Sequence, residues 1–323
     1  MERMSPQRMN DKKVVQRLSR FLEHRGAIGG GEYNEQGRVI RLDLSGASLK
    51  QVPSEVWELT ALRTLHLREN TLREIPSDIR RLTALQELDL SENELRVFPH
   101  EVGGLPALKR LVLDGNLLTT LAPEVGRLPA LEYLSLQCNR LTKLPREVGQ
   151  LTKLQLLHLY GNHVTELPGE IGHLVALEML CLDHNDLLTF PSEIGTLRRL
   201  QECYVQGNQL TSLPPEIGNL GALRALDVDG NHLREIPPEI GKLKALECLL
   251  LSKNDLTSLP AEIGDLIALQ ELDVQSNKLV TLPAGIAKLP RLTKLYVNGN
   301  PLTIPPAKVC QQGLPGIVAY LRN

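Results

Sequence analysis

Three side chains have the types that covalent or metal chemistry uses. His158 precedes Cys181 by 23 residues, and Asp227 follows 46 residues after Cys181. A thiol, an imidazole and a carboxylate that converge can serve as nucleophile, general base and orienting group, and the first two are also zinc ligands. Either chemistry requires these side chains to meet, so the elements that carry them decide the matter.

The histidine is predicted to lie on a short strand. In residues 154–174, LQLLHLYGNHVTELPGEIGHL, the side chains of Leu157 and Leu159 point to one face of such a strand. The opposite face then carries Leu156, His158 and Tyr160. A strand with one solvated face alternates apolar with polar residues, so this second face must be core, an active site or a surface for contact.

Twenty-three residues is also the period of a repeat that runs through most of the chain. Copies begin at Val39 and at residues 62, 85, 108, 131, 154, 177, 200, 223, 246, 269 and 292, without an insertion or a deletion. Each copy is close to L-x-x-L-x-L-x-x-N-x-L-x-x-L-P-x-E-I-G-x-L-x-x, and its positions are numbered 1 to 23 below. The twelve copies keep one register over about four fifths of the chain.

This pattern resembles the leucine-rich repeat of the intracellular 23-residue type. The resemblance implies an α/β fold, namely a right-handed solenoid, or horseshoe, with a parallel β-sheet on its concave side, short helical turns on its convex side and helical end caps. The run QGLPGIVAYLRN and the exit NPLTIPP are similar to the ends of repeat segments in Roco proteins and in Ras-group leucine-rich repeat proteins. In a Roco protein, a GTPase domain follows such a segment.

Several positions of the repeat have a structural explanation. Leucines at positions 4 and 6 point inward and pack against the next copy. Asparagine stands at position 9 in every copy except the first, which has Ala47, and it is predicted to bond backbone groups at the turn. The proline at position 15 is expected to preset φ for the first turn of a short helix, and the acidic residue at position 17 is expected to lie at the positive end of that turn. The glycine at position 19 is expected to permit a left-handed exit from the turn.

The predicted domains are residues 1–38, 39–302 and 303–323. The first contains a cap helix over residues 11–24 and a flexible arm, the second contains the twelve repeats, and the third contains a C-terminal cap helix. One face of the first helix is predicted to be apolar, with Val14, Leu18, Phe21 and Leu22. Because residues 1–25 carry seven Lys and Arg against three Asp and Glu, a membrane-surface or calmodulin-like segment is an alternative interpretation.

Composition and charge exclude several classes of function. The net charge of −2 and the pI near 6.5 give no electrostatic basis for binding nucleic acid. No stretch is long and apolar enough for stable membrane insertion, and the N-terminus lacks the apolar region of a signal peptide.

The five cysteines have neither zinc-site spacing nor disulfide clusters, which favours reduced thiols and a cytoplasmic location. No G-x-x-x-x-G-K-[ST] motif is present, so any nucleotide chemistry would lie outside these residues.

Neither metal binding nor catalysis is the favoured interpretation of the histidine, the cysteine and the aspartate. Zinc needs three or four converging ligands, and only His158 and Cys181 are predicted neighbours. Cys181 and Cys248 are expected three strands apart, about 14 Å from the strand spacing, which is too far for a disulfide. Exposed strand positions also provide no pocket and no oxyanion donors. We therefore predict no catalytic residue, no metal and no cofactor.

Positions 3, 5 and 7 are left free by the repeat, and in copies five to nine they hold tyrosine, methionine and aspartate. Tyrosine and methionine on a rigid concave face offer a large contact area at a low cost in ordering entropy. We therefore predict a non-catalytic scaffold for protein–protein interaction in signalling, with carboxylates that favour a basic partner. The predicted binding residues are Tyr133, Leu156, His158, Tyr160, Met179, Cys181, Asp183, Tyr204, Asp227 and Asp229.

The partner is predicted to be a protein or a peptide, and the resemblance adds small GTPases and GTPase domains as a partner class. A second hypothesis makes the chain the regulatory repeat domain of a larger Roco-type GTPase, with the nucleotide chemistry outside the chain. A third hypothesis is recognition of a lipid or a glycan by stacking along the concave face.

Overall fold

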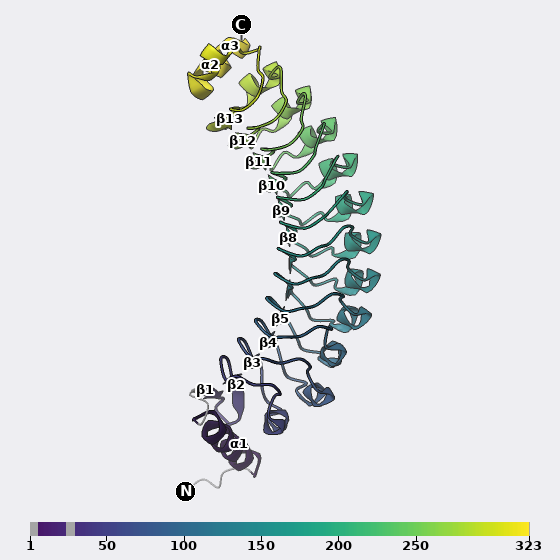
Figure 1. Cartoon of the computed structure of the whole chain (residues 1–323), viewed down its shortest axis with the longest axis vertical. Coiled ribbons are helices and arrows are strands. Elements are labelled where there is room, and N and C mark those ends of the chain that lie inside the picture. Colours follow the sequence, from purple (N-terminus) through teal and green to yellow (C-terminus); the bar gives the residue numbers. More distant parts are fainter. Residues whose placement is uncertain (1–5, 24–29, 323) are drawn as a thin grey trace. The chain divides into compact units, whose positions relative to one another are not determined.

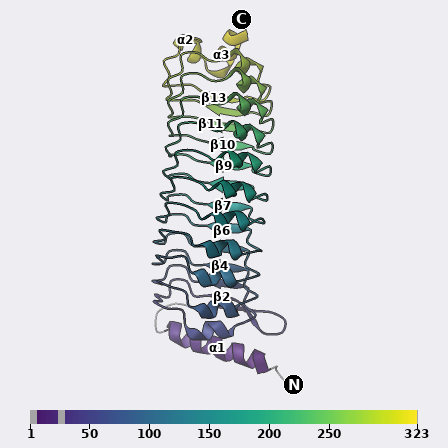
Figure 2. The same cartoon turned by 90° about the vertical axis from the view of Figure 1, so that its right-hand side faces the viewer.

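The computed structural model describes residues 6–23 and 30–322. The chain forms two compact units, Met1–Leu156 and Leu157–Asn323. In each unit, strands alternate with short helical turns along the chain (Figure 1), and Figure 2 shows that successive turns within a unit are stacked on one another. Each unit is therefore a solenoid built from the 23-residue repeat.

The first unit begins with a helix and an antiparallel strand pair. Helix α1 (Pro6–Glu23) precedes β1 (Gly30–Tyr33), which pairs antiparallel with β2 (Val39–Asp43). From β2 to β6, neighbouring strands are parallel, and each residue pairs with the residue 23 positions later. The further strands are β3 (Thr64–His66), β4 (Glu87–Asp89), β5 (Arg110–Val112) and β6 (Tyr133–Ser135). The 3-10 turns are η1 (Ser54–Glu58), η2 (Ser77–Arg81), η3 (His100–Gly104), η4 (Pro123–Arg127) and η5 (Arg146–Gln150).

Strand β7 (Leu156–His158) contains the boundary between the units. The second unit continues with parallel strands in the same register from β8 to β13. These are β8 (Met179–Cys181), β9 (Glu202–Tyr204), β10 (Ala225–Asp227), β11 (Cys248–Leu250), β12 (Glu271–Asp273) and β13 (Lys294–Tyr296). Its 3-10 turns are η6 (Gly169–His173), η7 (Ser192–Thr196), η8 (Pro215–Asn219), η9 (Pro238–Lys242), η10 (Ala261–Asp265) and η11 (Ala284–Lys288), and it ends in α2 (Ala307–Cys310) and α3 (Gly313–Arg322).

Columns of leucines form the core of each unit. At positions 4 and 6, Leu180 and Leu182 are fully buried, as predicted, and the same holds for their counterparts in neighbouring copies. Cys203 stands at position 4 in place of a leucine and is also fully buried, so it acts as a small apolar core residue. The side chains of the intervening positions 3, 5 and 7 therefore face away from the core.

The asparagines at position 9 bond the backbone as predicted. The Nδ2 of Asn93 donates to the carbonyls of Leu67, Leu90 and Ser91, at 3.0 Å each, and its Oδ1 accepts from Leu72 N–H at 3.0 Å. Two of these partners belong to the preceding copy, so each asparagine joins two turns of the solenoid.

The backbone takes its left-handed turn at a different place from the predicted one. Residues at position 8, three residues after the strand ends, have positive φ whether they are glycine, as at Gly207 (φ 65°), or not, as at His184 (φ 54°) and Lys253 (φ 52°). None of the glycines at position 19 has positive φ, so the prediction of a left-handed exit there is wrong. The prolines also differ from expectation, because most of them precede the 3-10 turn in extended conformation, as Pro237 does (φ −63°, ψ 142°).

The glycines at position 19 are required because consecutive turns pack closely. A Cβ on Gly241 would lie 2.6 Å from the backbone oxygen of Glu262 in the next copy, a distance that atoms do not adopt without displacing the turn. Position 19 therefore sets the spacing of the 3-10 turns rather than their exit.

We expect Gly241→Ala to lower the free energy of unfolding by about 2 kcal/mol, because the methyl group overpacks against a backbone that cannot move alone. Thermal or chemical denaturation measures the effect. Gly221→Ala is the matched control, since a Cβ there meets no atom within 4 Å. Equal stability of the two variants would contradict the assignment of position 19 to turn spacing.

Both ends of the chain differ in detail from expectation. The N-terminal helix begins at Pro6, and residues 30–33 of the predicted flexible arm form β1, because pairing with β2 covers the open edge of the sheet. Val14 and Leu18 are buried, so the apolar face of α1 is packed within the first unit. Residue 24 of the predicted helix, residues 25–29 after it, and the side chains of Phe21 and Leu22 lie outside the described residues.

The C-terminal segment forms two helices, α2 and α3, where one cap helix was expected, and Ile317 of α3 is buried. Within residues 6–23 and 30–322, no helix combines the length and the apolarity that crossing a membrane requires.

Candidate functional site

The predicted binding residues are divided between the two units. Tyr133 and Leu156 belong to the first unit, and the other eight belong to the second. The side chains at positions 3, 5 and 7 from His158 to Asn298 are called the strand face of the second unit below. The predicted residues on it are His158, Tyr160, Met179, Cys181, Asp183, Tyr204, Asp227 and Asp229.

One end of this strand face carries two pairs of contacting side chains that contain rings and a thioether. Tyr160 is 39% exposed and packs edge-to-face against His184, with ring centroids 5.3 Å apart and an interplanar angle of 81°. The Nε2 of His158 lies 3.4 Å from Sδ of Met179. The sequence did not single out His184 as a binding residue, although it stands at position 8, beside position 7 of the same copy.

Tyr204 holds a fixed position in the middle of the strand face. Its hydroxyl donates a hydrogen bond to Oε2 of Glu202, two residues earlier on the same strand, at 2.9 Å. Burial, with this bond adding to it, raises the pKa of the Tyr204 hydroxyl, so the residue stays neutral. The phenol ring is therefore presented in a defined orientation.

The aspartates of the strand face are bonded to the backbone. An oxygen of Asp183 accepts from Gln206 N–H at 2.7 Å, and Asp229 in the same way accepts from Ser252 N–H. Asp227 instead accepts from the N–H of Asp229, two residues later, at 2.9 Å. Each bond satisfies an N–H at position 7, so these carboxylates have a structural role that the sequence interpretation missed.

The recurrence of aspartate offers a signal that could have revealed this role. Aspartates at positions 5 and 7 in other copies make the same two kinds of bond: Asp43 with Ser45, Asp89 with Ser91, Asp114 with Gln137 and Asp273 with Gln275. A side chain that recurs at one position of a repeat because it bonds the backbone is not by itself evidence of a binding site.

Crowding of these carboxylates changes their protonation. Burial, together with the charges of Asp229, Asp183 and Asp273, raises the pKa of Asp227 to about 6, although the bond from Asp229 N–H opposes the shift. Burial also raises the pKa of Asp183 and of Asp229. The strand face therefore carries less negative charge in mildly acidic solution than its composition suggests.

We expect Asp227→Asn to raise the free energy of unfolding at pH 7 by about 1 kcal/mol, a value reduced for the exposed part of the side chain. Because its pKa is raised in the folded state, folding takes up a proton between pH 3.8 and about 6, and stability falls as pH rises through that window. The asparagine oxygen still accepts from Asp229 N–H.

Denaturation across this pH range measures the effect of Asp227→Asn. The difference in the free energy of unfolding between the variant and the wild type should vanish below pH 3.8. Asp265→Asn, at an exposed position, serves as the control. A variant that is less stable than the wild type at pH 7 would contradict the assigned shift.

The arrangement around Cys181 does not suit a nucleophile. Its thiol lies 3.4 Å from Oδ2 of Asp183, and burial with this neighbouring charge raises its pKa to about 12. All five cysteines are free thiols, and among the described residues no three His, Cys, Asp or Glu side chains group as metal ligands. His158 and Cys181 thus lie on one face but share no catalytic or metal-binding geometry.

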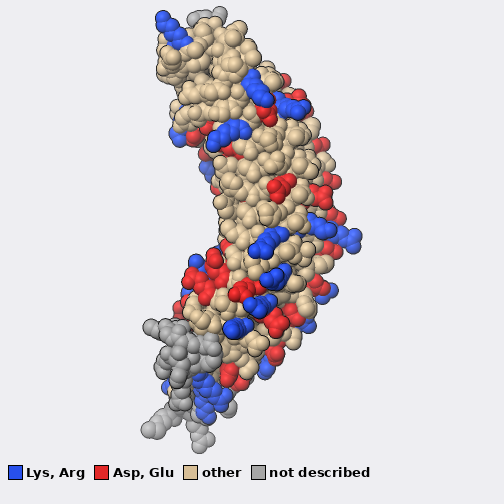
Figure 3. Space-filling view, viewed as in Figure 1, with Lys and Arg blue, Asp and Glu red and all other residues tan. Residues whose placement is uncertain are grey.

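On the first unit, Tyr133 belongs to an ionic cluster. The guanidinium carbon of Arg110 lies 3.6 Å from the centroid of the Tyr133 ring, and Nε of Arg110 is 3.6 Å from Oε1 of Glu87. On the side of this unit seen in Figure 3, Lys and Arg side chains lie beside Asp and Glu side chains rather than in a field of one sign. Tyr133 is therefore covered on one ring face, while Leu156 is half-buried.

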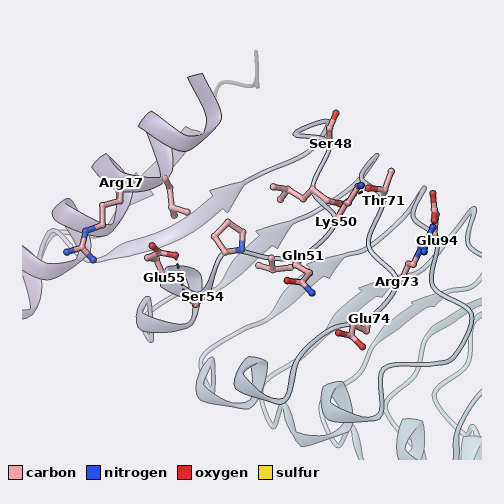
Figure 4. A pocket seen from close by; sticks show the side chains of 14 residues that line it. Arg17, Ser48, Lys50, Gln51, Ser54, Glu55, Thr71, Arg73, Glu74 and Glu94 are labelled. Carbon is pink, nitrogen blue, oxygen red and sulfur yellow. Dashed lines mark hydrogen bonds and ion pairs between the residues drawn. The ribbon is translucent and has the colours of Figure 1, made fainter. Parts of the chain in front are cut away.

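A hollow of about 1240 Å³ lies between α1 and the first repeats (Figure 4). It is lined by basic and acidic side chains, among them Arg17 of α1, Lys50 and Glu55, and Nε of Arg73 pairs with Oε2 of Glu94 at 2.9 Å. Neither a nucleophile with an adjacent base nor a set of like charges converges on it, so its chemistry selects no particular ligand.

Comparison with known proteins identifies the architecture. A family model described as a leucine-rich repeat region matches residues 36–132 and 118–208. The chain belongs to the leucine-rich repeat family. Two further leucine-rich repeat models match residues 199–220, 221–279 and 244–302, and no matched model describes a catalytic domain. No match was found among the curated proteins.

Solved structures similar to this leucine-rich repeat protein include a bacterial protein and a plant receptor. It is 35% identical to a leucine-rich repeat protein of Leptospira interrogans, over 84% of this chain and 75% of that chain, with a TM-score of 0.73. The plant peptide hormone receptor RGFR1 in complex with RGF2 is 30% identical, over 78% of this chain and 46% of that chain, with a TM-score of 0.63. The PEPR1–AtPEP1 structure is 28% identical, over 90% of this chain and 48% of that chain, with a TM-score of 0.71.

Proposed function

We propose that this leucine-rich repeat protein is a non-catalytic scaffold that binds a partner protein or peptide through the strand face of its second unit. The observation that carries the proposal is two contact pairs, Tyr160 with His184 and His158 with Met179, with Tyr204 on the same face. Leucine-rich repeats commonly mediate protein–protein interaction, and nothing in the repeat itself requires rings or a thioether at these positions.

These side chains have the properties of interface anchors. Tyr160 and Tyr204 each bury a large ring on binding while fixing only two side-chain torsions. Their orientation is already restrained, Tyr160 by His184 and Tyr204 by Glu202, so little further ordering is needed. The thioether of Met179 adds an adaptable apolar contact.

The carboxylates of the face favour a partner with a basic group. Asp183, Asp227 and Asp229 each use an oxygen to hold the backbone. Acceptor sites remain on each carboxylate for a lysine or an arginine of the partner. A cation would also favour the ionised form of Asp227, so binding of a basic partner should strengthen as pH rises through about 6.

The partner class and the cellular location remain predictions. One of the similar structures is titled as a plant peptide hormone receptor in complex with RGF2, which supports a peptide or protein partner for a face of this architecture. A small GTPase or GTPase domain as partner and a place in a Roco-type GTPase are proposed from the resemblance of the terminal repeat sequence, and a cytoplasmic location from the spacing of the cysteines.

Affinity capture with the purified chain as bait tests the proposal, using wild type and the Tyr160→Ala/Tyr204→Ala variant side by side. Tyr320→Ala is the matched control, because Tyr320 is also an exposed tyrosine of the second unit but lies on α3. A partner bound by wild type and by Tyr320→Ala, and lost with the double variant, supports the strand face. A partner retained by the double variant would place the binding surface elsewhere.

A further inference from the structure

A shallow groove of about 490 Å³ lies on the flank of the second unit. Its floor is formed by alanines at position 23 of three successive copies: Ala222, Ala245 and Ala268. At the same position, Arg199 precedes the three alanines and Arg291 follows them. This arginine groove, as we call it, lies at the amino ends of the strands, since the lining residues Gln201, Arg224 and Glu247 directly precede β9, β10 and β11.

The two end arginines are not required by the repeat. In the first eleven of the twelve copies, position 23 holds alanine eight times, so Arg199 and Arg291 replace the ordinary residue. Both are exposed, and neither has a hydrogen bond or an ion pair with any other described residue.

Other cations on this flank are, by contrast, engaged. Arg198 donates to the carbonyl of Asn219 at 2.7 Å, where it satisfies the end of η8. Arg224 pairs with Oε1 of Glu247 at 3.0 Å, and Lys244 donates to the carbonyl of Asp265 at 2.9 Å. The two end arginines are thus the guanidinium groups of this groove that keep all their donors available.

The spacing of the two arginines indicates the shape of a ligand. They stand four copies apart, which at a strand spacing of about 4.8 Å is about 19 Å. An extended chain advances about 3.3 Å per residue, so two of its side chains six residues apart span that distance. Between them, the ligand would lie on the methyl groups of Ala222, Ala245 and Ala268.

We propose that the arginine groove binds an extended acidic segment of a partner protein, with one carboxylate on Arg199 and a second, six residues along, on Arg291. A guanidinium group accepts a carboxylate through two parallel hydrogen bonds, which fixes the direction and register of the segment. This surface is separate from the strand-face residues and does not rest on their proposed function.

The test uses a fluorescein-labelled heptapeptide with glutamate at both ends and alternating serine and valine between them, titrated with the full chain and followed by fluorescence anisotropy. We expect saturable binding to wild type, weakened about fivefold or more by Arg199→Ala/Arg291→Ala, as the loss of two exposed charge pairs predicts. Because alanine is the ordinary residue at this position, the variant should fold normally, and circular dichroism checks this.

Two controls separate a register-specific site from general attraction of charge. Arg234→Ala/Lys288→Ala removes two exposed cations elsewhere on the second unit, and affinity should stay within about twofold of wild type. The same peptide with glutamine at both ends should bind to the wild-type protein weakly. Its affinity should equal that of the glutamate peptide for the Arg199→Ala/Arg291→Ala variant. The Tyr160→Ala/Tyr204→Ala variant should bind the acidic peptide with wild-type affinity. The arginine-groove proposal is therefore tested independently of the strand-face proposal.

Several results would overturn the proposal. No binding of the acidic peptide to wild type, equal losses in the groove and control variants, or equal binding of a heptathymidylate strand would each show that the arginines form no segment-specific site. Retained binding by the groove variant would place the peptide elsewhere.

Discussion

Replacing Asn208 with alanine is expected to lower the free energy of unfolding by about 4 kcal/mol, because buried backbone groups lose their partners. Nδ2 of Asn208 donates to the carbonyls of Leu182 and Val205 at 3.0 Å, and its Oδ1 accepts from Leu187 N–H at 3.0 Å. The side chain is only 2% exposed, so water cannot take the place of these bonds.

Hydrogen exchange followed residue by residue measures this loss together with denaturation. In a solenoid, the effect should be strongest in the copies next to the change, so the Leu187 N–H is expected to exchange fastest. Gln209→Ala, at the exposed neighbouring position, is the control and should change stability little. If Asn208→Ala leaves the Leu187 amide protected, the asparagine does not hold the turn.

Asparagine at position 9 could be assigned its role from sequence because the role depends on side-chain chemistry alone. Only an amide of that size offers both donors and an acceptor, and its recurrence at one position locates it at one point of every turn. The glycine at position 19 could not be assigned in the same way. Glycine is required both where φ is positive and where another backbone approaches, and sequence does not distinguish the two causes.

The left-handed residue was harder still to locate, because position 8 is not reserved for glycine. It holds Glu92, Cys138, His184 and Lys253 as well as glycines, and all of these residues have positive φ. There the hydrogen bonds of neighbouring copies force the conformation on whichever residue is present. Glu92 N–H, for example, donates to Asp114 O, and His184 N–H donates to Gln206 O, at 2.7 Å in both cases. Glycine stands at position 8 in six of the twelve copies, so residue type alone marks the left-handed position only in part.

For the candidate site, the direction of the side chains could be predicted, but their partners could not. The period of two along a strand placed Tyr160 and Tyr204 outside the core, as the structure has them. Whether a neighbouring side chain covers a ring depends on rotamers, and the period does not specify these. Arg110 thus covers Tyr133, whereas His184 supports Tyr160 at its edge. The backbone bonds of Asp183 and Asp229 cross from one copy to the next, a relation visible only once the copies are stacked.

Replacing Asp11 with alanine is expected to lower the stability of the N-terminal cap by about 3 kcal/mol, because a buried cation loses its counter-charge. Oδ2 of Asp11 accepts from Nε of Arg38 at 2.8 Å and from the N–H of Val39 at 3.0 Å, and Asp11 is 1% exposed. One carboxylate thus ties α1 to the start of β2, at the edge where the first leucines would otherwise meet water. Limited proteolysis and hydrogen exchange at Val39 measure the loosening.

Three further variants separate the causes. Asp11→Asn keeps an acceptor for Val39 N–H but removes the charge, so it should fall between wild type and Asp11→Ala. Arg38→Ala combined with Asp11→Ala should recover part of the loss, since no unpaired buried charge remains. Lys12→Ala, at an exposed position of the same helix, should behave as wild type. If Asp11→Ala and Lys12→Ala have the same protease sensitivity, then α1 is held by the packing of Val14 and Leu18 alone, and the ion pair adds nothing to the cap.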